Sequence, residues 1–320
     1  MVSEFDLIRR YFTPPTGSAV LGVGDDCALI RPRPGTLLAV STDMLLEGRH
    51  FLAGTDPQRL GHKVLAVNLS DLAAMGADAR WALLAIALPA ADEEWVAAFA
   101  RGFFNLAGRF GVELVGGDTT RGPLAMSMTV LGEVPTGLAL RRSGALAGDD
   151  IWLSGSTGDA AMGLACLQGE CALAPDALAA CQSRLETPEP RLELGGRLRG
   201  IARSAIDVSD GLLADLGHIL EASGVAAEVQ FDALPRSQAL GACRDVQRAQ
   251  DCLLAGGDDY ELVFTAAPPA RGEIEALSRE LGLALTRIGV VMPGEPRLMV
   301  RRRDGSELPV AHRGFDHFVQ

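Results

Sequence analysis

The spacing of apolar residues along the 320-residue chain alternates between a helical and a strand period. Apolar positions three or four residues apart predict helices in the first half over residues 5–12, 56–75 and 92–110. Short apolar runs predict strands over residues 36–40, 81–88, 112–115 and 125–134. The first of these runs, 36–40, is expected to be a buried strand that continues into Ser41-Thr42-Asp43.

Polar and glycine residues between 140 and 150 interrupt this pattern, and strand signals begin again at Ile151. Further strands are predicted over residues 151–153, 261–265, 286–291 and 297–300, with helices from 159, around 190–200 and over 211–222. The interruption predicts two domains, residues 1–145 and 146–320. Neither half shows a clean strand–helix–strand repeat, so the pattern favours a mixed α+β fold over a doubly wound sheet.

Composition narrows the class of protein. Hydrophobic residues make up 48% and charged residues 22% of the chain, which is typical of a folded globular protein. The formal net charge of −12 argues against a nucleic-acid partner. The longest nearly apolar run, 81–91, is too short to span a bilayer, and the N-terminus lacks the apolar core of a signal peptide. We therefore expect a cytoplasmic protein with no membrane partner.

The cysteine and lysine content of the chain excludes further classes of protein. The six cysteines include no C-x-x-C pair, so reduced thiols are expected rather than a disulfide framework. Lys63 is the only lysine and does not follow a glycine, which excludes the Walker A phosphate-binding loop. The strand lysine, H-R-D and D-F-G set of protein kinases is also missing.

Acidic residues cluster with glycine, serine and threonine at breaks between the predicted elements. Five such blocks occur, at residues 22–26, 41–43, 116–122, 207–211 and 256–260. Any one block is explained as a turn or a helix cap, because these residue types favour both. Five blocks, each next to an apolar strand or helix, instead indicate binding loops on a rigid scaffold.

Asp71 interrupts an apolar stripe. Leu60, Val64, Val67, Asp71 and Met75 recur at helical spacing, which places the carboxylate on the face expected to meet the core. A buried carboxylate needs a compensating charge, and two partners remain equally plausible at this point. One is an arginine from a neighbouring helix, and the other is a bound divalent cation.

The available ligands favour Mg²⁺ over zinc, because they are mostly oxygens and the five histidines are scattered. His50 by itself is most simply a surface histidine. The glycines at 116–117 and the start of the helix at Gly211 could bring backbone N–H groups to a phosphate, and Arg121 and Arg142 could supply further donors. Together these features predict Mg²⁺-dependent phosphoryl chemistry without a P-loop.

The ordered set of motifs resembles the thiamine-monophosphate kinase family from end to end. The matching segments are Gly22-Val23-Gly24-Asp25-Asp26-Cys27-Ala28, Ser41-Thr42-Asp43, Asn68-Leu69-Ser70-Asp71-Leu72-Ala73-Ala74-Met75-Gly76-Ala77, Gly116-Gly117-Asp118-Thr119-Thr120-Arg121-Gly122, Ile206-Asp207-Val208-Ser209-Asp210-Gly211-Leu212, Gly257-Asp258-Asp259-Tyr260-Glu261-Leu262 and Gly314-Phe315-Asp316-His317-Phe318. The wider superfamily includes aminoimidazole ribonucleotide synthetase and shares only part of this set. The chain lacks the early reactive cysteine of selenophosphate synthetase and the terminal cysteine of the hydrogenase-maturation ATPase.

The resemblance implies a two-domain synthetase-like fold. Its N-terminal domain would bind ATP and Mg²⁺ and pair across a twofold axis into a barrel-like dimer core, and its C-terminal α/β domain would cover the active-site cleft. It implies ATP-dependent conversion of thiamine monophosphate to thiamine diphosphate by a homodimer that uses several Mg²⁺ ions. The implied metal ligands are Asp26, Ser41, Thr42, Asp43, Asp71, Asp118, Asp207 and Asp210. The implied ATP contacts are Gly117, Asp118, Arg142 and Ser209, and the implied thiamine-phosphate contacts are His50, Asp258 and Phe315.

Two positions depart from the family pattern. The family often has Glu at the position of Asp258 and Tyr or Trp at the position of Phe315.

The acceptor phosphate is already anionic, so we expect direct in-line transfer with no general base, carried by positioning and charge neutralisation. Two alternatives stay open: another ATPase of the superfamily with a different small substrate, and a non-catalytic nucleotide-binding protein stabilised by metal.

Overall fold

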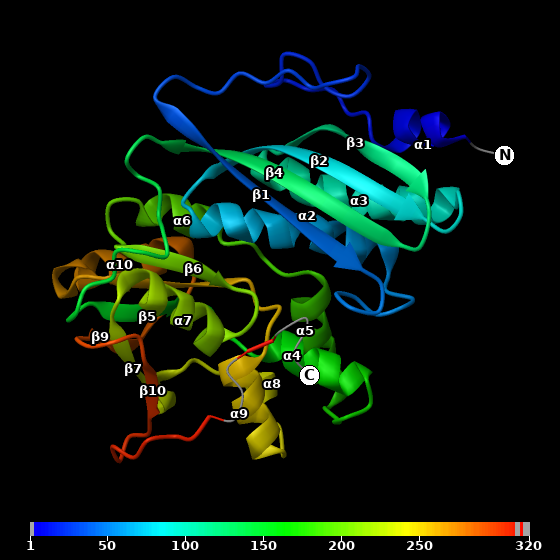
Figure 1. The fold of residues 1–320 in the computed structure, drawn as a ribbon. Helices are drawn as coiled ribbons and strands as arrows, with labels where there is room; N and C mark the ends of the chain where they lie inside the picture. The colour runs from blue at the N-terminus through cyan, green and yellow to red at the C-terminus, as the bar shows by residue number, and fades with distance from the viewer. Residues whose placement is uncertain (1–2, 311–313, 316–320) are drawn as a thin grey trace. The chain divides into compact units, whose positions relative to one another are not determined.

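The computed structural model describes residues 3–310 and 314–315, and its internal contacts divide the chain into two compact units. Unit 1 is Met1–Leu72 with Ala77–Gly137, and unit 2 is Ala73–Gly76 with Leu138–Gln320. Each unit contains a sheet that combines parallel and antiparallel strands with helices (Figure 1). This confirms the predicted mixed α+β class.

Unit 1 is built around a four-stranded sheet in the order β1-β4-β2-β3, in which only β2 and β3 are parallel. Its elements are α1 (Glu4–Tyr11), β1 (Thr36–Leu46), α2 (Pro57–Ala74), β2 (Asp78–Leu88), α3 (Glu93–Phe110), β3 (Glu113–Arg121) and β4 (Ala125–Pro135). Helices α2 and α3 lie behind the sheet in Figure 1. Their backbones touch at Gly102, where a Cβ atom would lie 1.8 Å from the carbonyl oxygen of Gln58.

Within the residues that the structure describes, the other face of this sheet is uncovered. On β1, Leu38, Val40 and Met44 have 39%, 61% and 57% of their surface exposed. The prediction of a buried strand over 36–40 is therefore wrong. The physical reason is that β1 is an edge strand whose outward side chains are not covered by any described part of the chain.

Unit 2 contains a six-stranded sheet in the order β10-β7-β9-β5-β8-β6, parallel only between β10 and β7. The strands are β5 (Asp150–Ser154), β6 (Ser204–Val208), β7 (Ala226–Gln230), β8 (Glu261–Ala266), β9 (Leu285–Met292) and β10 (Leu298–Arg301). The helices are α4 (Asp159–Leu167), α5 (Pro175–Glu186), α6 (Leu192–Leu198), α7 (Leu212–Ser223), α8 (Gln238–Gly241), α9 (Val246–Ala255) and α10 (Arg271–Leu281). The apolar pattern of the sequence did not predict β7, α5, α8, α9 or α10.

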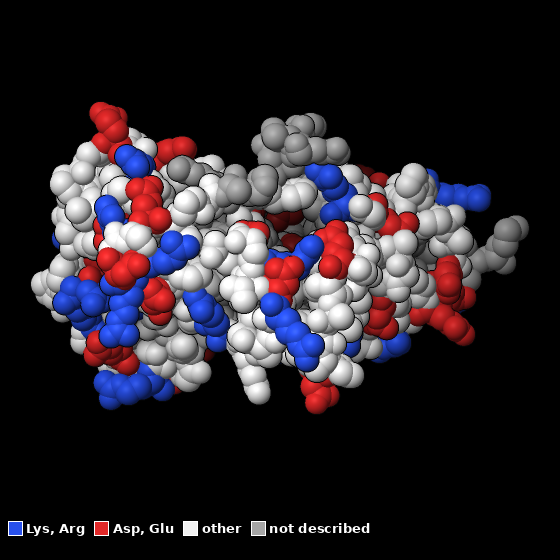
Figure 2. Space-filling model, turned by 90° about the horizontal axis from the view of Figure 1, so that it is seen from below, with Lys and Arg blue, Asp and Glu red and all other residues white. Residues whose placement is uncertain are grey.

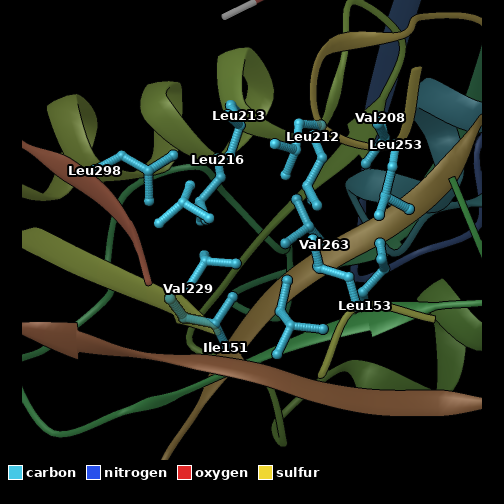
Figure 3. Close-up of a cluster of buried hydrophobic side chains, with 14 of the residues drawn as sticks. Ile151, Leu153, Val208, Leu212, Leu213, Leu216, Val229, Leu253, Val263 and Leu298 are labelled. Carbon is cyan, nitrogen blue, oxygen red and sulfur yellow. The ribbon is translucent and has the colours of Figure 1, made fainter. Parts of the chain in front are cut away.

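Buried side chains on the two faces of this sheet form two separate clusters. Figure 3 shows the larger one, in which Leu212, Leu213 and Leu216 of α7 lie over valine, leucine and isoleucine side chains of the sheet. Trp152 and Phe264 belong to the other cluster and stack with ring centroids 6.4 Å apart. Apolar burial on both faces explains why β5, β6 and β8 are buried along their whole length.

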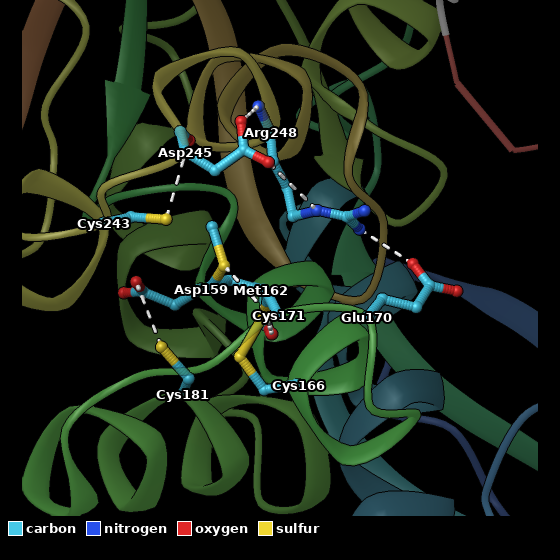
Figure 4. Close-up of a disulfide and its surroundings, with 9 residues drawn as sticks. All are labelled: Asp159, Met162, Cys166, Glu170, Cys171, Cys181, Cys243, Asp245 and Arg248. Atoms are coloured by element: carbon cyan, nitrogen blue, oxygen red, sulfur yellow. Dashed lines mark hydrogen bonds and ion pairs between the residues drawn. A yellow bond between two sulfur atoms is a disulfide. The ribbon is translucent and has the colours of Figure 1, made fainter.

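Cys166, near the end of α4, forms a disulfide with Cys171, so the expectation of reduced thiols is wrong for this pair. Figure 4 shows Cys181 and Cys243 nearby, with the Cys181 thiol 3.8 Å from a carboxylate oxygen of Asp159. Burial raises the pKa of Cys181 to about 12, and the Asp159 charge adds to this effect. This thiol is therefore protonated and unreactive at neutral pH.

None of the helices in the described ranges is both long and apolar enough to cross a membrane. On the face drawn in Figure 2, acidic and basic side chains are interspersed. That face therefore offers no continuous basic surface.

Candidate active site

In unit 1 the structure joins Asp71 to Ser41. The Ser41 hydroxyl on β1 donates a hydrogen bond to Oδ2 of Asp71 on α2. Asp43 lies two residues along β1 from Ser41, so its side chain is on the same helix-facing side of the sheet. The sheet and α2 thus bring three predicted oxygen ligands to one side of β1.

Thr42 lies on the opposite face of β1. Its hydroxyl donates to the carbonyl oxygen of Met128 at 3.0 Å and accepts from the Thr129 hydroxyl at 3.0 Å. Both partners belong to β4, so these bonds fix the rotamer of Thr42 against the neighbouring strand.

The block at 116–122 is mostly strand, not the glycine loop expected from sequence. Gly117 pairs with Leu84 and Asp118 with Ala85 across the parallel β2–β3 ladder. A Cβ atom on Gly117, which has φ 151°, would lie 1.8 Å from the Leu84 carbonyl oxygen, so close strand packing requires this glycine. Asp118 is exposed, and β1 and β3 are opposite edges of the sheet. The structure therefore does not bring Thr42 and Asp118 together, because three strand spacings of about 4.8 Å separate their backbones.

A small cavity of about 40 Å³ lies beside Gly117 and Asp118. Its other walls are mainly apolar side chains, from α1, β2 and β3 with Val23. The cavity places an apolar surface next to two of the residues expected to contact ATP.

Two hydrogen bonds anchor His50, which follows β1, one at its ring and one at its backbone. The N–H of Leu46 donates to Nδ1 of His50 at 3.1 Å, which makes this ring nitrogen an acceptor. The ammonium group of Lys63 donates to the His50 carbonyl oxygen at 3.2 Å. Lys63 is 3% exposed, so the chain's only lysine is used to hold this turn from inside.

Asp26 lies in an exposed segment whose start is anchored by a carboxylate. Glu113 accepts hydrogen bonds from the N–H groups of Gly17, Ser18 and Ala19 at 2.7–3.1 Å. Burial raises the pKa of Glu113, but the three N–H donors outweigh burial, and the net pKa is lowered. The acid that orders this segment is thus ionised at neutral pH.

In unit 2 the block at 207–211 connects β6 to α7 and is held by Asp215. One oxygen of Asp215 accepts from the N–H groups of Ser209, Asp210 and Gly211 at 3.0–3.1 Å. Asp215 is 2% exposed. Burial, followed by the charge of Asp210, raises the pKa of Asp215 to about 7 even though the three N–H donors lower it.

The carbonyl groups of the same loop bind the two segments expected to contact the acceptor. The N–H of Asp258 donates to the Ser209 carbonyl at 2.8 Å, and the N–H of Phe315 donates to the Asp210 carbonyl at 2.9 Å. A third bond joins the N–H of Tyr260 to the Val208 carbonyl at 2.8 Å. One loop therefore gathers Asp207, Ser209, Asp210, Asp258 and Phe315. Of the tail motif at 314–318, only its first two residues lie within the described part of the chain.

Arg142 lies apart from this group within unit 2. The carbonyl of the preceding residue, Arg141, accepts from the N–H of Ala205, near the start of β6. Ser209 follows four residues later, about 13 Å along an extended strand. The backbone alone therefore does not place Arg142 beside Ser209.

Within residues 3–310 and 314–315, no three His, Cys, Asp or Glu side chains are clustered closely enough to hold a metal ion by themselves. The Asp71 carboxylate beside the Ser41 hydroxyl is a hard-oxygen donor set of the kind that suits Mg²⁺. Such ions commonly complete their coordination with water and substrate phosphates rather than with an all-protein cage.

Two residues of this site were missed from sequence. Asp215 lies in the first turn of a predicted helix just after a glycine, a position where an acid typically serves backbone N–H groups. Tyr260 lies within a quoted motif, but nothing in the letters indicated that its hydroxyl bonds to Asp258.

The class of protein to which this chain belongs is defined by two family models. A family model for the N-terminal domain of AIR synthase related proteins matches residues 24–134, and the corresponding C-terminal model matches residues 147–301. Together they cover most of the chain, so its architecture is that of the AIR synthase related proteins.

Individual relatives are more specific. A thiamine-monophosphate kinase of Salmonella typhimurium is 46% identical over 321 residues, covering 99% of this chain and 98% of that protein. The crystal structure of thiamine-monophosphate kinase from Stenotrophomonas maltophilia K279a is 50% identical, with a TM-score of 0.85 over 91% of this chain and 92% of that chain. A structure called AaThiL complexed with AMPPCP and TMP is 30% identical, with a TM-score of 0.76 over 90% and 89%.

The chain therefore belongs to the thiamine-monophosphate kinase family, which makes it a phosphotransferase. This confirms the resemblance drawn from the motifs.

Proposed function

We propose that this protein transfers the γ-phosphoryl group of ATP to thiamine monophosphate and forms thiamine diphosphate. The observation that carries the proposal is the backbone of the 207–211 loop, which holds residues expected to bind ATP and metal and is hydrogen-bonded to Asp258 and Phe315. The named complex of a 30% identical relative with AMPPCP, an ATP analogue, and TMP supports the same pair of substrates.

The direct test incubates the purified protein with ATP and thiamine monophosphate, with and without Mg²⁺, and measures thiamine diphosphate. Formation of thiamine diphosphate only with Mg²⁺ supports the proposal. A panel of other small phosphate and amine acceptors provides the control. Turnover of one of these acceptors in place of thiamine monophosphate would assign the protein to a different ATPase of the superfamily.

We further propose that Mg²⁺ ions are bound in unit 1 by Ser41, Asp43 and Asp71 on one side of β1 and, at separate positions, by Asp26, Thr42 and Asp118, and in unit 2 by Asp207 and Asp210. The Ser41–Asp71 contact supports the assignment, since it places two hard oxygen donors side by side. When bound, Mg²⁺ would neutralise the charge between the acceptor phosphate and the ATP tail. Gly117, Asp118, Arg142 and Ser209 would contact ATP.

The mechanism needs no general base in this proposal. The acceptor oxygen belongs to a phosphate and is already anionic, so the barrier comes from charge repulsion and misalignment. Residues that hold the two substrates in line supply most of the rate enhancement. The rigid hydrogen bonding of the 207–211 loop to Asp215 and to the segments at 258 and 315 suits this positioning role.

Replacing Phe315 with alanine should selectively weaken binding of the acceptor, thiamine monophosphate. Phe315 is 49% exposed, and its ring is proposed to stack on the thiamine rings, with His50 and Asp258 as further proposed contacts. Losing this stacking should raise the KM for thiamine monophosphate by about 5- to 150-fold, an effect of roughly 1–3 kcal/mol. The KM for ATP should barely change. Steady-state kinetics with each substrate varied in turn measures both values.

Arg142→Ala is the matched comparison and should show the opposite selectivity, with the KM for ATP raised and that for thiamine monophosphate nearly constant. If Phe315→Ala raised both KM values equally and also lowered the melting temperature, Phe315 would be a packing residue of unit 2 and would leave the proposed substrate site.

We also propose that the protein is a homodimer that pairs through the uncovered sheet of unit 1. The exposed apolar side chains of Leu38, Val40 and Met44 on the edge strand β1 support this, since exposed apolar side chains that gather on one face favour a twofold partner. Multi-angle light scattering should give about twice 33.6 kDa. Val40→Asp should shift the mass towards one chain, whereas Val246→Asp, at a 75% exposed valine of unit 2, should not. A fully active monomer at micromolar concentration would contradict the dimer.

A further inference from the structure

The segment from Gly257 to Glu261 has an unusual backbone. Asp258 has φ 67° and Tyr260 has φ 52°, and within residues 3–310 and 314–315 they are the only non-glycine residues in the left-handed region. This conformation is unfavourable for residues with a side chain, and for an aromatic residue it is rare. Such strain persists where the surroundings enforce it and often marks a functional position.

Two buried acidic side chains hold this backbone from inside unit 2. Asp259 is 1% exposed and accepts a hydrogen bond from the N–H of Gly158 at 2.8 Å. Glu261 is 0% exposed and accepts from Arg184 at 2.5 Å and from Arg191 at 2.5 and 2.7 Å. Residues 259 and 261 of the segment are therefore each held in place by a buried side chain.

Backbone hydrogen bonds also hold the segment from Gly257 to Glu261 in place. The N–H groups of Asp258 and Tyr260 are taken by the carbonyls of Ser209 and Val208. The alternation leaves Asp258 and Tyr260 half-buried while Asp259 and Glu261 are buried. The strained conformation therefore turns the side chains of residues 258 and 260 away from the buried cluster.

Those two side chains are bonded to each other. The Tyr260 hydroxyl donates to Oδ1 of Asp258 at 2.8 Å. A phenol is a strong donor to a carboxylate, and this bond fixes the rotation of the Asp258 carboxyl group. The carboxylate is thus oriented before any ligand arrives, which removes an ordering cost from binding.

We infer that Tyr260 is a positioning residue for the acceptor: it orients the Asp258 carboxylate toward the cationic ring and amino group of thiamine. The inference rests on the proposed role of Asp258 at the acceptor. A fixed carboxylate favours a ligand that carries a positive ring and an N–H donor, and it contributes nothing to the polyphosphate of ATP. Tyr260 therefore acts on affinity for the acceptor alone.

The test replaces Tyr260 with phenylalanine, which keeps the ring and removes one oxygen atom. We expect the KM for thiamine monophosphate to rise by about 5- to 10-fold, which is less than the direct loss of a hydrogen bond to a charged group would cause, because the hydroxyl acts on the acceptor only through Asp258. The KM for ATP should stay within about twofold, and kcat should change less than the acceptor KM. Calorimetric titration of thiamine monophosphate without ATP should show the same loss in affinity.

The chain offers a matched control, because Tyr11 is its only other tyrosine. The Tyr11 hydroxyl donates to Glu93 at 3.3 Å in unit 1. Tyr11→Phe should leave both KM values unchanged. If Tyr260→Phe lowers the melting temperature and raises both KM values together, the hydroxyl is structural and the inference is overturned.

Asp258→Ala and the double variant separate this inference from the proposed function. If Asp258→Ala raises the acceptor KM and Tyr260→Phe adds nothing further to it, Tyr260 acts through Asp258 and the inference is supported. If Asp258→Ala raises that KM but Tyr260→Phe has no effect, or the two effects add, Tyr260 does not position Asp258. If Asp258→Ala leaves the acceptor KM unchanged, the substrate role of Asp258 itself fails, and the inference fails with it.

Discussion

Replacing Asp71 with asparagine is expected to lower kcat by at least about 100-fold, or roughly 2.7 kcal/mol of transition-state stabilisation. The change keeps the shape of the side chain and removes its charge. The Ser41 hydroxyl can still donate to the amide oxygen, so the contact between β1 and α2 survives. The loss should therefore appear in turnover, measured at saturating ATP, thiamine monophosphate and Mg²⁺, while the melting temperature changes little.

Asp92→Asn is the matched control in unit 1. Asp92 caps α3 by accepting from the N–H groups of Glu94 and Trp95, and asparagine caps a helix equally well. This variant should be fully active. Near-normal turnover in Asp71→Asn would reject the metal role and favour a structural ion pair for Asp71.

The second large effect concerns stability. Glu261→Ala should lower the free energy of unfolding by about 3–5 kcal/mol, because it leaves the charges of Arg184 and Arg191 without their carboxylate in a buried site. Glu261 also accepts a hydrogen bond from the Ser154 hydroxyl at 2.6 Å, so the substitution removes a side-chain bond between β5 and β8 as well. Urea unfolding followed by tryptophan fluorescence and circular dichroism measures the change.

Glu280→Ala is the comparison for an exposed pair. Glu280 binds Arg197 at 2.6 Å, but their side chains are 57% and 51% exposed. Its removal should cost less than about 1 kcal/mol, since solvent screens such pairs. Equal effects of the two substitutions would show that the Glu261 cluster contributes no more than a surface contact.

Local chemistry was enough to predict the helices whose ends are capped. The helix predicted over 92–110 corresponds to α3, with Asp92 as its N-cap and Gly111 in the left-handed conformation at its C-cap. Asp71 was also identified from periodicity alone, because an acid in an apolar stripe needs a partner. Both signals are local and do not depend on which segments meet in space.

Pairing between distant segments decided the features that were predicted wrongly or missed. Gly116 and Gly117 have the composition of a loop, yet their ladder with β2 makes them strand. The edge position of β1 exposes residues that its apolar composition suggested were buried. The strand β7 (Ala226–Gln230) is short and rich in alanine, and the helix α9 (Val246–Ala255) is short, with its buried side chains Cys252, Leu253 and Leu254 grouped near its end.

The same distinction between local signals and long-range pairing applies to the residues of the candidate site. The motif letters identified Asp258 and Phe315, but not that both are bonded to the loop at 207–211. The Tyr260–Asp258 bond depends on two left-handed residues. No local rule specifies that backbone, because the buried partners of Asp259 and Glu261 come from residues that are distant in sequence.

The burial of Lys63 determines which reagents can report on this protein. Amine-directed dyes and crosslinkers such as glutaraldehyde attack exposed lysine side chains, and the chain's only lysine is 3% exposed with its ammonium group held by the His50 carbonyl. Failure to crosslink two chains through lysine would therefore carry no information about assembly. Probes aimed at carboxylates, or at a cysteine or lysine introduced on the surface, are the appropriate choice.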